Sequence, residues 1–149
     1  MFDVELKIRT VPQVVEDSKD DLLKVIDSWS ISKLEGMWKG KAEESVELSI
    51  ICDVDKSKDI AKELKAAEIS SIEIHLEGDL GAGKTFLSRS IIKSFGWKDL
   101  VKSPTYTLCE EYDLDNCLFL HIDLYRTNEA QDIDIFNLDR EIDLKKIIE

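Results

Sequence analysis

The chain has 149 residues, of which 43% are hydrophobic and 35% are charged, and its formal net charge is −12. This length suits one compact domain or a domain with a short attachment, and the apolar content is enough for a core, which excludes disorder throughout. The acidic balance argues against an extended basic surface for nucleic acid. It leaves open an action on RNA within a larger complex whose other subunits hold the RNA.

The sequence contains no apolar run of about 18 residues, and its N-terminus alternates charged with apolar side chains. It therefore predicts neither a membrane span nor a signal peptide. The three cysteines, Cys52, Cys109 and Cys117, have no metal-binding spacing and are typical of buried thiols in a reducing compartment. We expect a cytoplasmic protein that makes no membrane contact.

The first 45 residues carry one strand pattern and one helix pattern. Phe2–Arg9 alternates like a half-buried strand, and Thr10 with Gln13 marks the start of an amphipathic helix that continues to Val25. Between Ser28 and Ser45 the pattern weakens, which predicts a loop or turn region. We place a boundary near Ser45 and treat residues 1–45 as an extension of unknown role.

From Val46 onward, strand and helix patterns alternate as they do in α/β domains. The predicted elements are a strand at Val46–Cys52, a helix from Asp55 or Ser57 to Ala67, a strand at Ile72–Leu76, a helix at Lys84–Phe95 ended by Gly96, strands at Thr105–Tyr112 and Cys117–Leu124 joined by a turn at 113–116, and a helical pattern from Asp132 to Leu144. We therefore predict an α/β fold, with a P-loop NTPase-type mixed sheet flanked by helices in residues 46–149 and an N-terminal β-α extension.

The segment Gly78–Thr85 (GDLGAGKT) fits the phosphate-binding pattern G-x-x-x-x-G-K-[ST] and lies between a predicted strand and a predicted helix. A loop that wraps a triphosphate turns its backbone N–H groups inward, which requires glycine at several positions. Lys84 supplies positive charge to the phosphates, Thr85 offers a hydroxyl to Mg²⁺, and the helix N-terminus faces the phosphates. The predicted residues for binding ATP and Mg²⁺ are Gly78, Asp79, Leu80, Gly81, Ala82, Gly83, Lys84 and Thr85.

A second acidic group is predicted at Asp123, where the apolar strand Leu118–Ile122 ends, as in a Walker B arrangement. The sequence contains no Asn-Lys-x-Asp segment that reads guanine, and Asp123 is not followed by the Gly of a GTPase D-x-x-G motif. Adenine is therefore the favoured base.

Other polar residues near these motifs have two interpretations each. The hydroxyl-rich segment Ser103–Thr107 is either a switch-like loop near the γ-phosphate or a turn that enters a strand. Arg126 either reaches phosphate or forms an ordinary salt bridge. We expect His75 and His121 in the core or at a strand edge rather than in catalysis.

Three segments together resemble the TsaE (YjeE) family in their order and spacing: His75–Thr85 (HLEGDLGAGKT), Val101–Leu108 (VKSPTYTL) and His121–Arg126 (HIDLYR). The resemblance covers Val46 to Asp143, about two-thirds of the chain. It implies a small P-loop α/β domain and a bacterial ATPase that supports threonylcarbamoyl transfer to adenosine 37 of ANN-decoding tRNAs, the t6A modification. It also implies a TsaD–TsaB heterodimer as partner, contact with tRNA only through that complex, and ATP hydrolysis that resets the complex between turnovers.

By position, the resemblance implies roles for individual residues. Lys84 and the loop glycines would hold phosphate, and Thr85 would hold Mg²⁺. Thr105 would be the switch-like residue and Asp123 the acid near the metal and water, which makes these two the candidate catalytic residues. Phe86 replaces a second Thr that the family often has, and we include it among the nucleotide-binding positions.

The chain departs from the family pattern at both ends. The family continues into a strand ending in Glu-Trp-Pro, whose Glu is a metal-site acid, whereas this sequence stops at Glu149. Either Glu149 is that metal-site acid or the strand is absent, and in both cases we expect the last strands of the usual domain to be missing. Residues 1–45 are additional, and we hypothesise that their strand and helix complete the sheet in place of the missing edge.

The leading hypothesis is thus an ATPase subunit of t6A synthesis. The departure at the C-terminus favours, as an alternative, a degenerate module that binds nucleotide or a partner without turnover. A third hypothesis is a small-molecule P-loop kinase. Against it, the sequence shows no basic lid segment, and only Arg126 and Arg140 lie beyond Asp123 as arginines.

Overall fold

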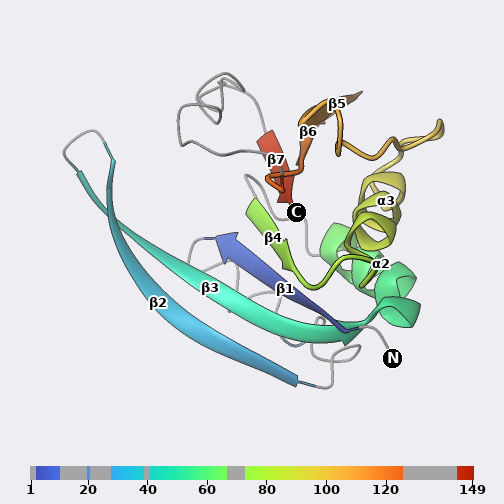
Figure 1. Ribbon diagram of the computed structural model, residues 1–149. Helices are drawn as coiled ribbons and strands as arrows, with labels where there is room; N and C mark the ends of the chain where they lie inside the picture. The colour runs from blue at the N-terminus through green and yellow to red at the C-terminus, as the bar shows by residue number, and fades with distance from the viewer. Residues whose placement is uncertain (1–2, 11–19, 21–27, 39–40, 67–72, 126–143) are drawn as a thin grey trace.

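The computed structural model describes residues 3–10, 20, 28–38, 41–66, 73–125 and 144–149. These residues form a seven-stranded sheet in the order β2-β3-β1-β4-β7-β6-β5, with two α-helices packed against it (Figure 1). The strands are β1 (Asp3–Thr10), β2 (Ser28–Trp38), β3 (Lys41–Asp53), β4 (Glu73–Glu77), β5 (Cys109–Leu114), β6 (Cys117–Ile122) and β7 (Leu144–Ile148). The helices are the 3₁₀ turn η1 (Val54–Lys56), α2 (Ser57–Ala66) and α3 (Lys84–Ser94). The predicted α/β fold with a mixed sheet is confirmed.

Three neighbouring strands, β4, β7 and β6, run parallel to one another, whereas the other strand pairs of this sheet are antiparallel. Parallel strands bring their carboxyl ends to the same edge of a sheet, which is where α/β proteins bind ligands. The residues that directly follow these three strands are Gly78, Glu149 and Asp123. The topology alone therefore brings the predicted phosphate loop and two carboxylates together.

The core lies between the sheet and the two helices. Helix α2 buries Ile60, Ala61 and Leu64, and helix α3 buries Leu87, Ile91 and Ile92, as the helical spacing predicts. The strands meet them with residues that share one face, which are Val4, Leu6, Ile50, Ile74, Leu76, Phe119 and Ile147. The rings of Phe119 and Phe95 also pack in a T-shaped arrangement, with 5.0 Å between ring centroids. This packing fixes α3, and with it the start of the helix at Lys84, against the parallel strands.

The opposite face of β1 and β4 is polar. The Lys7 ammonium donates to Glu77 Oε1 at 2.7 Å, and Ser49 Oγ donates to Glu5 Oε1 at 2.6 Å. The hydrogen bond with Glu77 is the main reason that the pKa of Lys7 is raised. His75 lies on this face beside Glu73. Since Glu77 directly precedes Gly78, the Lys7 contact ties β1 to the strand end from which the phosphate loop starts.

The prediction of a loop or turn region between Ser28 and Ser45 is wrong. This segment forms β2 and the first part of β3, and the two strands pair from Ser28↔Ile51 to Trp38↔Lys41. Backbone hydrogen bonds between two adjacent antiparallel strands form in register one after another, so pairing continues even where the side-chain pattern is weak. Serines at 28, 30 and 32 do alternate with larger side chains, which is a period-two signal in a short run.

Other boundaries also differ from the predictions, for example at the end of β6, which is Ile122 rather than Leu124. Leu144, assigned to a helical pattern, begins β7, because it pairs with Leu118 of the buried neighbouring strand β6. Strand β5 begins at Cys109 rather than at Thr105, because residues 104–107 form a turn. The predicted helix from Thr10 to Val25 falls almost entirely outside the described residues, as do Arg126 and the helical pattern from Asp132 to residue 143.

The position of β1 yields a stability prediction. β1 pairs with β3 on one side and with β4 on the other, and its Val4 and Leu6 are fully buried. A chain that begins at Val46 lacks β1, β2 and the first five residues of β3. Without β1, strands β3 and β4 lose their common partner and the core loses two large side chains. Each such side chain contributes about 2–5 kcal/mol, against a total stability of about 5–15 kcal/mol. We expect this shortened chain to show no cooperative urea unfolding by circular dichroism.

The full chain carrying Ile31→Ala serves as control, because Ile31 is an exposed residue of the edge strand β2. Its free energy of unfolding should change by less than about 1 kcal/mol. Equal stability of the shortened and full chains would contradict the central structural role of β1 and the hypothesis that residues 1–45 complete the sheet.

Candidate functional site

A cavity of about 830 Å³ opens at the edge where β4, β7 and β6 end. It brings together nearly all of the site residues predicted from sequence. The predicted residues that line it are Gly78, Asp79, Leu80, Gly81, Gly83, Lys84, Thr85, Phe86, Thr105, Asp123 and Glu149. Ala82, the remaining residue of the loop, is buried in the main core cluster.

The loop at Gly78–Thr85 has the backbone shape that its glycines allow. Gly81 and Gly83 have φ angles of 83° and 106°, in the left-handed region that L side chains rarely adopt. Apart from its two chain neighbours, no described residue has a heavy atom within 4 Å of a Cβ placed on Gly81, so the dihedral angle and not space requires glycine there. The turn is closed by Ala82 N–H donating to the Asp79 carbonyl at 3.0 Å, and α3 then begins at Lys84.

The Lys84 ammonium folds back over this loop. It donates to the carbonyl oxygens of Gly78 at 2.7 Å and of Asp79 at 3.1 Å. The charge is therefore held at the mouth of the loop by two backbone acceptors rather than extended into solvent. This position suits a group that neutralises phosphate bound in the loop.

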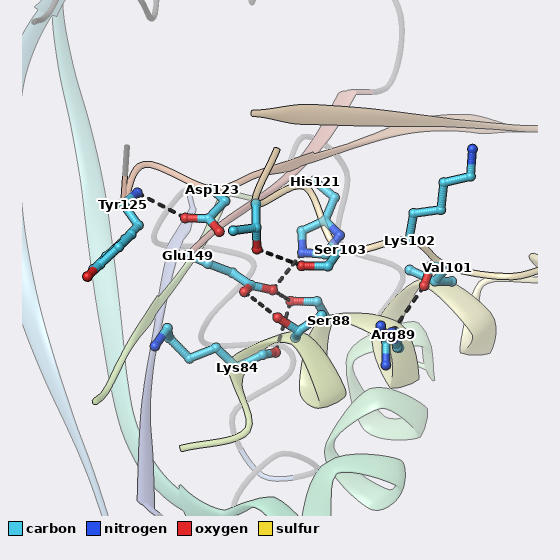
Figure 2. A network of polar contacts seen from close by, with 12 residues as sticks. Lys84, Ser88, Arg89, Val101, Lys102, Ser103, His121, Asp123, Tyr125 and Glu149 are labelled. Atoms are coloured by element: carbon cyan, nitrogen blue, oxygen red, sulfur yellow. Dashed lines mark hydrogen bonds and ion pairs between the residues drawn. The ribbon is translucent and has the colours of Figure 1, made fainter. Parts of the chain in front are cut away.

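Glu149 is the most connected side chain of the site (Figure 2). Its Oε2 accepts a hydrogen bond from Thr85 Oγ1 at 2.8 Å. Its Oε1 accepts from Ser88 Oγ at 2.6 Å and lies 2.6 Å from His121 Nε2. Two of these donors come from α3 and one from β6, so the carboxylate joins the helix of the phosphate loop to the strand of Asp123.

The ionisation of Glu149 reflects two opposing effects. Burial is the largest and would raise its pKa, because the side chain is only 4% exposed. The opposing effect is larger in total, and it lowers the pKa of Glu149 below its ordinary value. It consists of the hydrogen bond and the charge interaction with His121, followed by the hydrogen bonds from Ser88 and Thr85. The site thus holds a buried negative charge.

The backbone places Glu149 by continuing the parallel pairing of β7 with β6. Glu149 N–H donates to the Ile122 carbonyl at 2.8 Å, and Leu124 N–H donates to the Glu149 carbonyl at 2.9 Å. Strand β7 lies between the phosphate-loop strand and the strand that ends at Asp123. The described structure thus has a strand directly before Glu149, and the two alternatives for the family's metal-site acid stay predictions.

Asp123 is buried at the end of β6 and is held through its own backbone and side chain. Its N–H donates to the Leu108 carbonyl at 3.0 Å, and its Oδ1 accepts from Tyr125 N–H at 2.9 Å. Leu108 has a φ of 63°, an unfavourable angle for a residue with a side chain, and its own N–H donates to the Pro104 carbonyl at 2.7 Å. Leu108 thereby links the hydroxyl-rich segment to Asp123.

The hydroxyl-rich segment is anchored before it reaches the cavity. Arg89 Nε donates to the Val101 carbonyl at 3.1 Å, and Lys102 N–H donates to the Tyr112 hydroxyl at 3.0 Å. Thr105 follows these anchors, lines the cavity and shares a 2.8 Å hydrogen bond with Ser103. The turn at this point therefore places Thr105 at the cavity.

The gathered oxygen atoms suit Mg²⁺ with a nucleotide. Mg²⁺ prefers oxygen ligands, keeps several waters, and takes only one or two carboxylates alongside substrate phosphates. Thr85 and Asp123 line the cavity, and Glu149 bonds Thr85. No cluster of three His, Cys, Asp or Glu side chains that would cage a metal occurs among the residues that the structure describes. A site completed by water and phosphate fits these residues.

Two residues of the network, Ser88 and His121, were not predicted. Ser88 lies three residues after Thr85 and therefore on the same face of α3, and His121 lies two residues before Asp123 and therefore on the same face of β6. Both spacings were visible in the sequence. The sequence did not show that Glu149 lies next to both side chains, because it is 61 residues from Ser88 and 28 from His121 along the chain.

Comparisons with known proteins identify the family of the chain. A family model described as "Threonylcarbamoyl adenosine biosynthesis protein TsaE" matches residues 51–149. The chain belongs to the TsaE family. No helix of the described parts of this TsaE-family chain is long and apolar enough to cross a membrane.

Three relatives carry the name tRNA threonylcarbamoyladenosine biosynthesis protein TsaE. The Haemophilus influenzae protein is 43% identical over 75 residues, which are 50% of this chain and 48% of the relative. The Bacillus subtilis protein is 36% identical over 80 residues (53% and 51%), and the Nostoc sp. protein is 32% identical over 114 residues (76% and 62%). The chain thus spans about half the length of most of these curated relatives. Among solved structures, a DUF3240 family protein from Shewanella baltica is similar at 12% identity and a TM-score of 0.45, over 54% of this chain and 99% of that protein.

The anchoring role of Tyr112 can be tested by Tyr112→Phe. This change removes the hydroxyl that accepts from Lys102 N–H and donates to the Lys102 carbonyl at 3.3 Å. We expect a loss of about 1 kcal/mol or more in the free energy of unfolding, measured in urea, because a partly buried backbone group loses its partner. Tyr125→Phe is the matched control, since Tyr125 is 78% exposed, and should have no measurable effect.

The pH dependence gives a second readout of the same variant. Burial, partly offset by the hydrogen bond with Lys102, raises the pKa of Tyr112 above 10.0. A raised pKa favours the neutral hydroxyl in the folded state, so its contribution is complete below pH 10.0 and is lost as the pH rises through the folded pKa. The stability difference between wild type and Tyr112→Phe should therefore shrink above that pH. A difference that grows would contradict the assignment.

Proposed function

We propose that this chain is the ATP-binding subunit of tRNA threonylcarbamoyladenosine (t6A) synthesis and that it hydrolyses ATP with Mg²⁺. The observation that carries the proposal is the convergence of the Gly78–Thr85 loop, Asp123 and Glu149 on one cavity at the carboxyl ends of three parallel strands. Membership of the TsaE family supports the biosynthetic role, since the relatives are named for it. We place the chain in the cytoplasm, where tRNA is modified.

In this proposal the loop and the start of α3 hold the triphosphate. The positive φ angles of Gly81 and Gly83 allow backbone N–H groups to turn toward phosphate, and the helix dipole favours the negative charge. Lys84 exchanges the Gly78 and Asp79 carbonyls for phosphate oxygens. Bound Mg²⁺ would supply charge neutralisation on the phosphates, and Thr85, Asp123 and Glu149 would hold it directly or through water.

The remaining roles fall to Asp123 and Thr105. Asp123 is fixed by the Leu108 carbonyl and by Tyr125 N–H, so its free carboxylate oxygen is available to orient a water molecule. Thr105 lines the same cavity from a turn anchored at Val101 and Lys102, and we propose it as the switch-like residue. These two side chains approach the cavity from β6 and from the hydroxyl-rich segment, and Lys84 approaches it from α3.

Large apolar side chains surround the mouth of the cavity. Leu80 is 91% exposed and Tyr125 is 78% exposed, and Phe86 beside them is about half exposed. Exposed apolar groups around a site favour a protein partner that covers it. We propose the TsaD–TsaB heterodimer as this partner, with tRNA contacted only through it.

Nucleotide binding depends on the Lys84 charge in this proposal. Lys84→Ala should weaken binding of a fluorescent ATP analogue at least about 100-fold, because charge-assisted hydrogen bonds to phosphate are lost. Lys93→Ala is the control, since Lys93 lies exposed on the same helix and should leave the affinity unchanged. Unaltered binding by Lys84→Ala would remove the assignment of the phosphate loop.

Turnover is tested by steady-state ATP hydrolysis with and without TsaD–TsaB. We expect hydrolysis that rises when the partners are added and that Asp123→Asn reduces by at least about 100-fold, as loss of a positioned acid does. Binding of ATP with turnover at background even in the presence of the partners would contradict the ATPase and support a binding module without turnover. The departure at the C-terminus motivated that alternative, and the presence of β7 with Glu149 in the site weakens its basis.

A further inference from the structure

The imidazole of His121 is buried next to the proposed metal site without a role in the proposed function. It is fully buried, and its Nε2 lies 2.6 Å from Glu149 Oε1. Its Nδ1 is buried and has no hydrogen-bond partner among the described residues. A buried polar atom without a partner is costly, and in native structures such an atom often marks a functional constraint. A side chain chosen for packing alone would be apolar here, like Phe119 on the same strand face.

The contacts of Glu149 divide between its two oxygens. Ser88 and His121 both hold Oε1, from α3 and from β6 respectively, whereas among the described residues only Thr85 bonds Oε2. Ser88 Oγ also lies 3.0 Å from the Lys84 carbonyl of the preceding turn, but its single proton serves the shorter contact with Glu149 Oε1 at 2.6 Å. Two donors on Oε1 therefore restrict rotation of the carboxylate and keep Oε2 directed at the Thr85 hydroxyl.

A glutamate needs such restraint more than an aspartate does. Its longer side chain loses more rotamer freedom when it is fixed, so a single hydrogen bond leaves the direction of a free oxygen poorly defined. Groups that orient a metal-site carboxylate from outside typically change metal affinity by about 10–100-fold when they are removed. His121 and Ser88 occupy that position toward Glu149, and neither lines the cavity itself.

We propose that His121 and Ser88 are positioning residues that clamp one oxygen of Glu149 and thereby aim its other oxygen at the Mg²⁺ side of the nucleotide site. This inference rests on the proposed function, because it needs Mg²⁺ to bind beside Thr85. It assigns His121 no contact with nucleotide and no proton transfer. His121 changes the affinity for Mg²⁺ only by fixing the orientation of the Glu149 carboxylate.

The test measures binding of a fluorescent ATP analogue to the full chain at stepwise Mg²⁺ concentrations and in EDTA. His121→Leu removes the donor, and His121→Gln restores an N–H group near the position of Nε2. We expect His121→Leu to raise the half-saturating Mg²⁺ concentration by about 10-fold or more, with nucleotide affinity in EDTA within about twofold of wild type. His121→Gln should return the Mg²⁺ requirement to within about threefold of wild type.

Serine variants of α3 provide a matched pair. Ser88→Ala should raise the Mg²⁺ requirement in the same direction as His121→Leu. Ser90→Ala should not, because the Ser90 hydroxyl bonds only the Phe86 carbonyl of its own helix among the contacts of the described residues. Ser88→Ala removes one oxygen atom, so it also carries the test if His121→Leu does not fold.

The outcomes separate the two proposals. A wild-type chain that binds nucleotide with no dependence on Mg²⁺ would overturn the metal site and, with it, this inference. A wild-type chain with clear Mg²⁺ dependence that His121→Leu and Ser88→Ala both retain would overturn the clamp alone. A purely structural role would lower thermal stability and leave the Mg²⁺ requirement unchanged, and His121→Gln would then offer no specific rescue.

Discussion

The parallel alignment of β4, β7 and β6 is the constraint on which the rest of the site depends. Each of these strands delivers one functional segment at its carboxyl end, and no two of the segments are close in sequence. β7 is the central strand of the three, so the carboxylate that follows it lies between the phosphate loop and Asp123. Antiparallel pairing of any one of these strands would send its segment to the opposite edge of the sheet.

Burying the Glu149 carboxylate at that point is energetically unfavourable, and hydrogen bonds from neighbouring side chains offset this cost. Burial disfavours the charged form of Glu149, but hydrogen bonds from three side chains more than offset this, and the pKa falls. The charge also lies near the N-terminal turn of α3, where the helix dipole favours a negative group. The same features that would attract phosphate therefore make the carboxylate tolerable.

The fold class and the phosphate loop could be predicted from sequence because both depend on local signals. The spacing of Gly78, Gly81 and Gly83 with Lys84 is contained in eight residues, and the apolar stripes of α2 and α3 have the period of a helix. The pairing of β2 with β3 could not be read in the same way, since the backbone ladder sustains it beyond the clear side-chain pattern.

The partners of Glu149 were beyond sequence reasoning for a different physical reason. His121 and Ser88 are ordinary residues for a strand and a helix, and only the arrival of β7 between β4 and β6 gives them a carboxylate to hold. Their significance is therefore a property of the tertiary structure and has no local pattern.

The central place of β7 also has a consequence for the order in which the molecule assembles. β4 and β6 have no direct pairing in this sheet, because each meets the other only through β7, which follows both in the chain. The gap between β4 and β6 closes only after β7 has been synthesised. The pairing of β4 with β7 joins segments far apart in sequence, and such pairings typically form slowly. A nascent or partly folded chain can thus contain the complete phosphate loop and Asp123 and still lack the site.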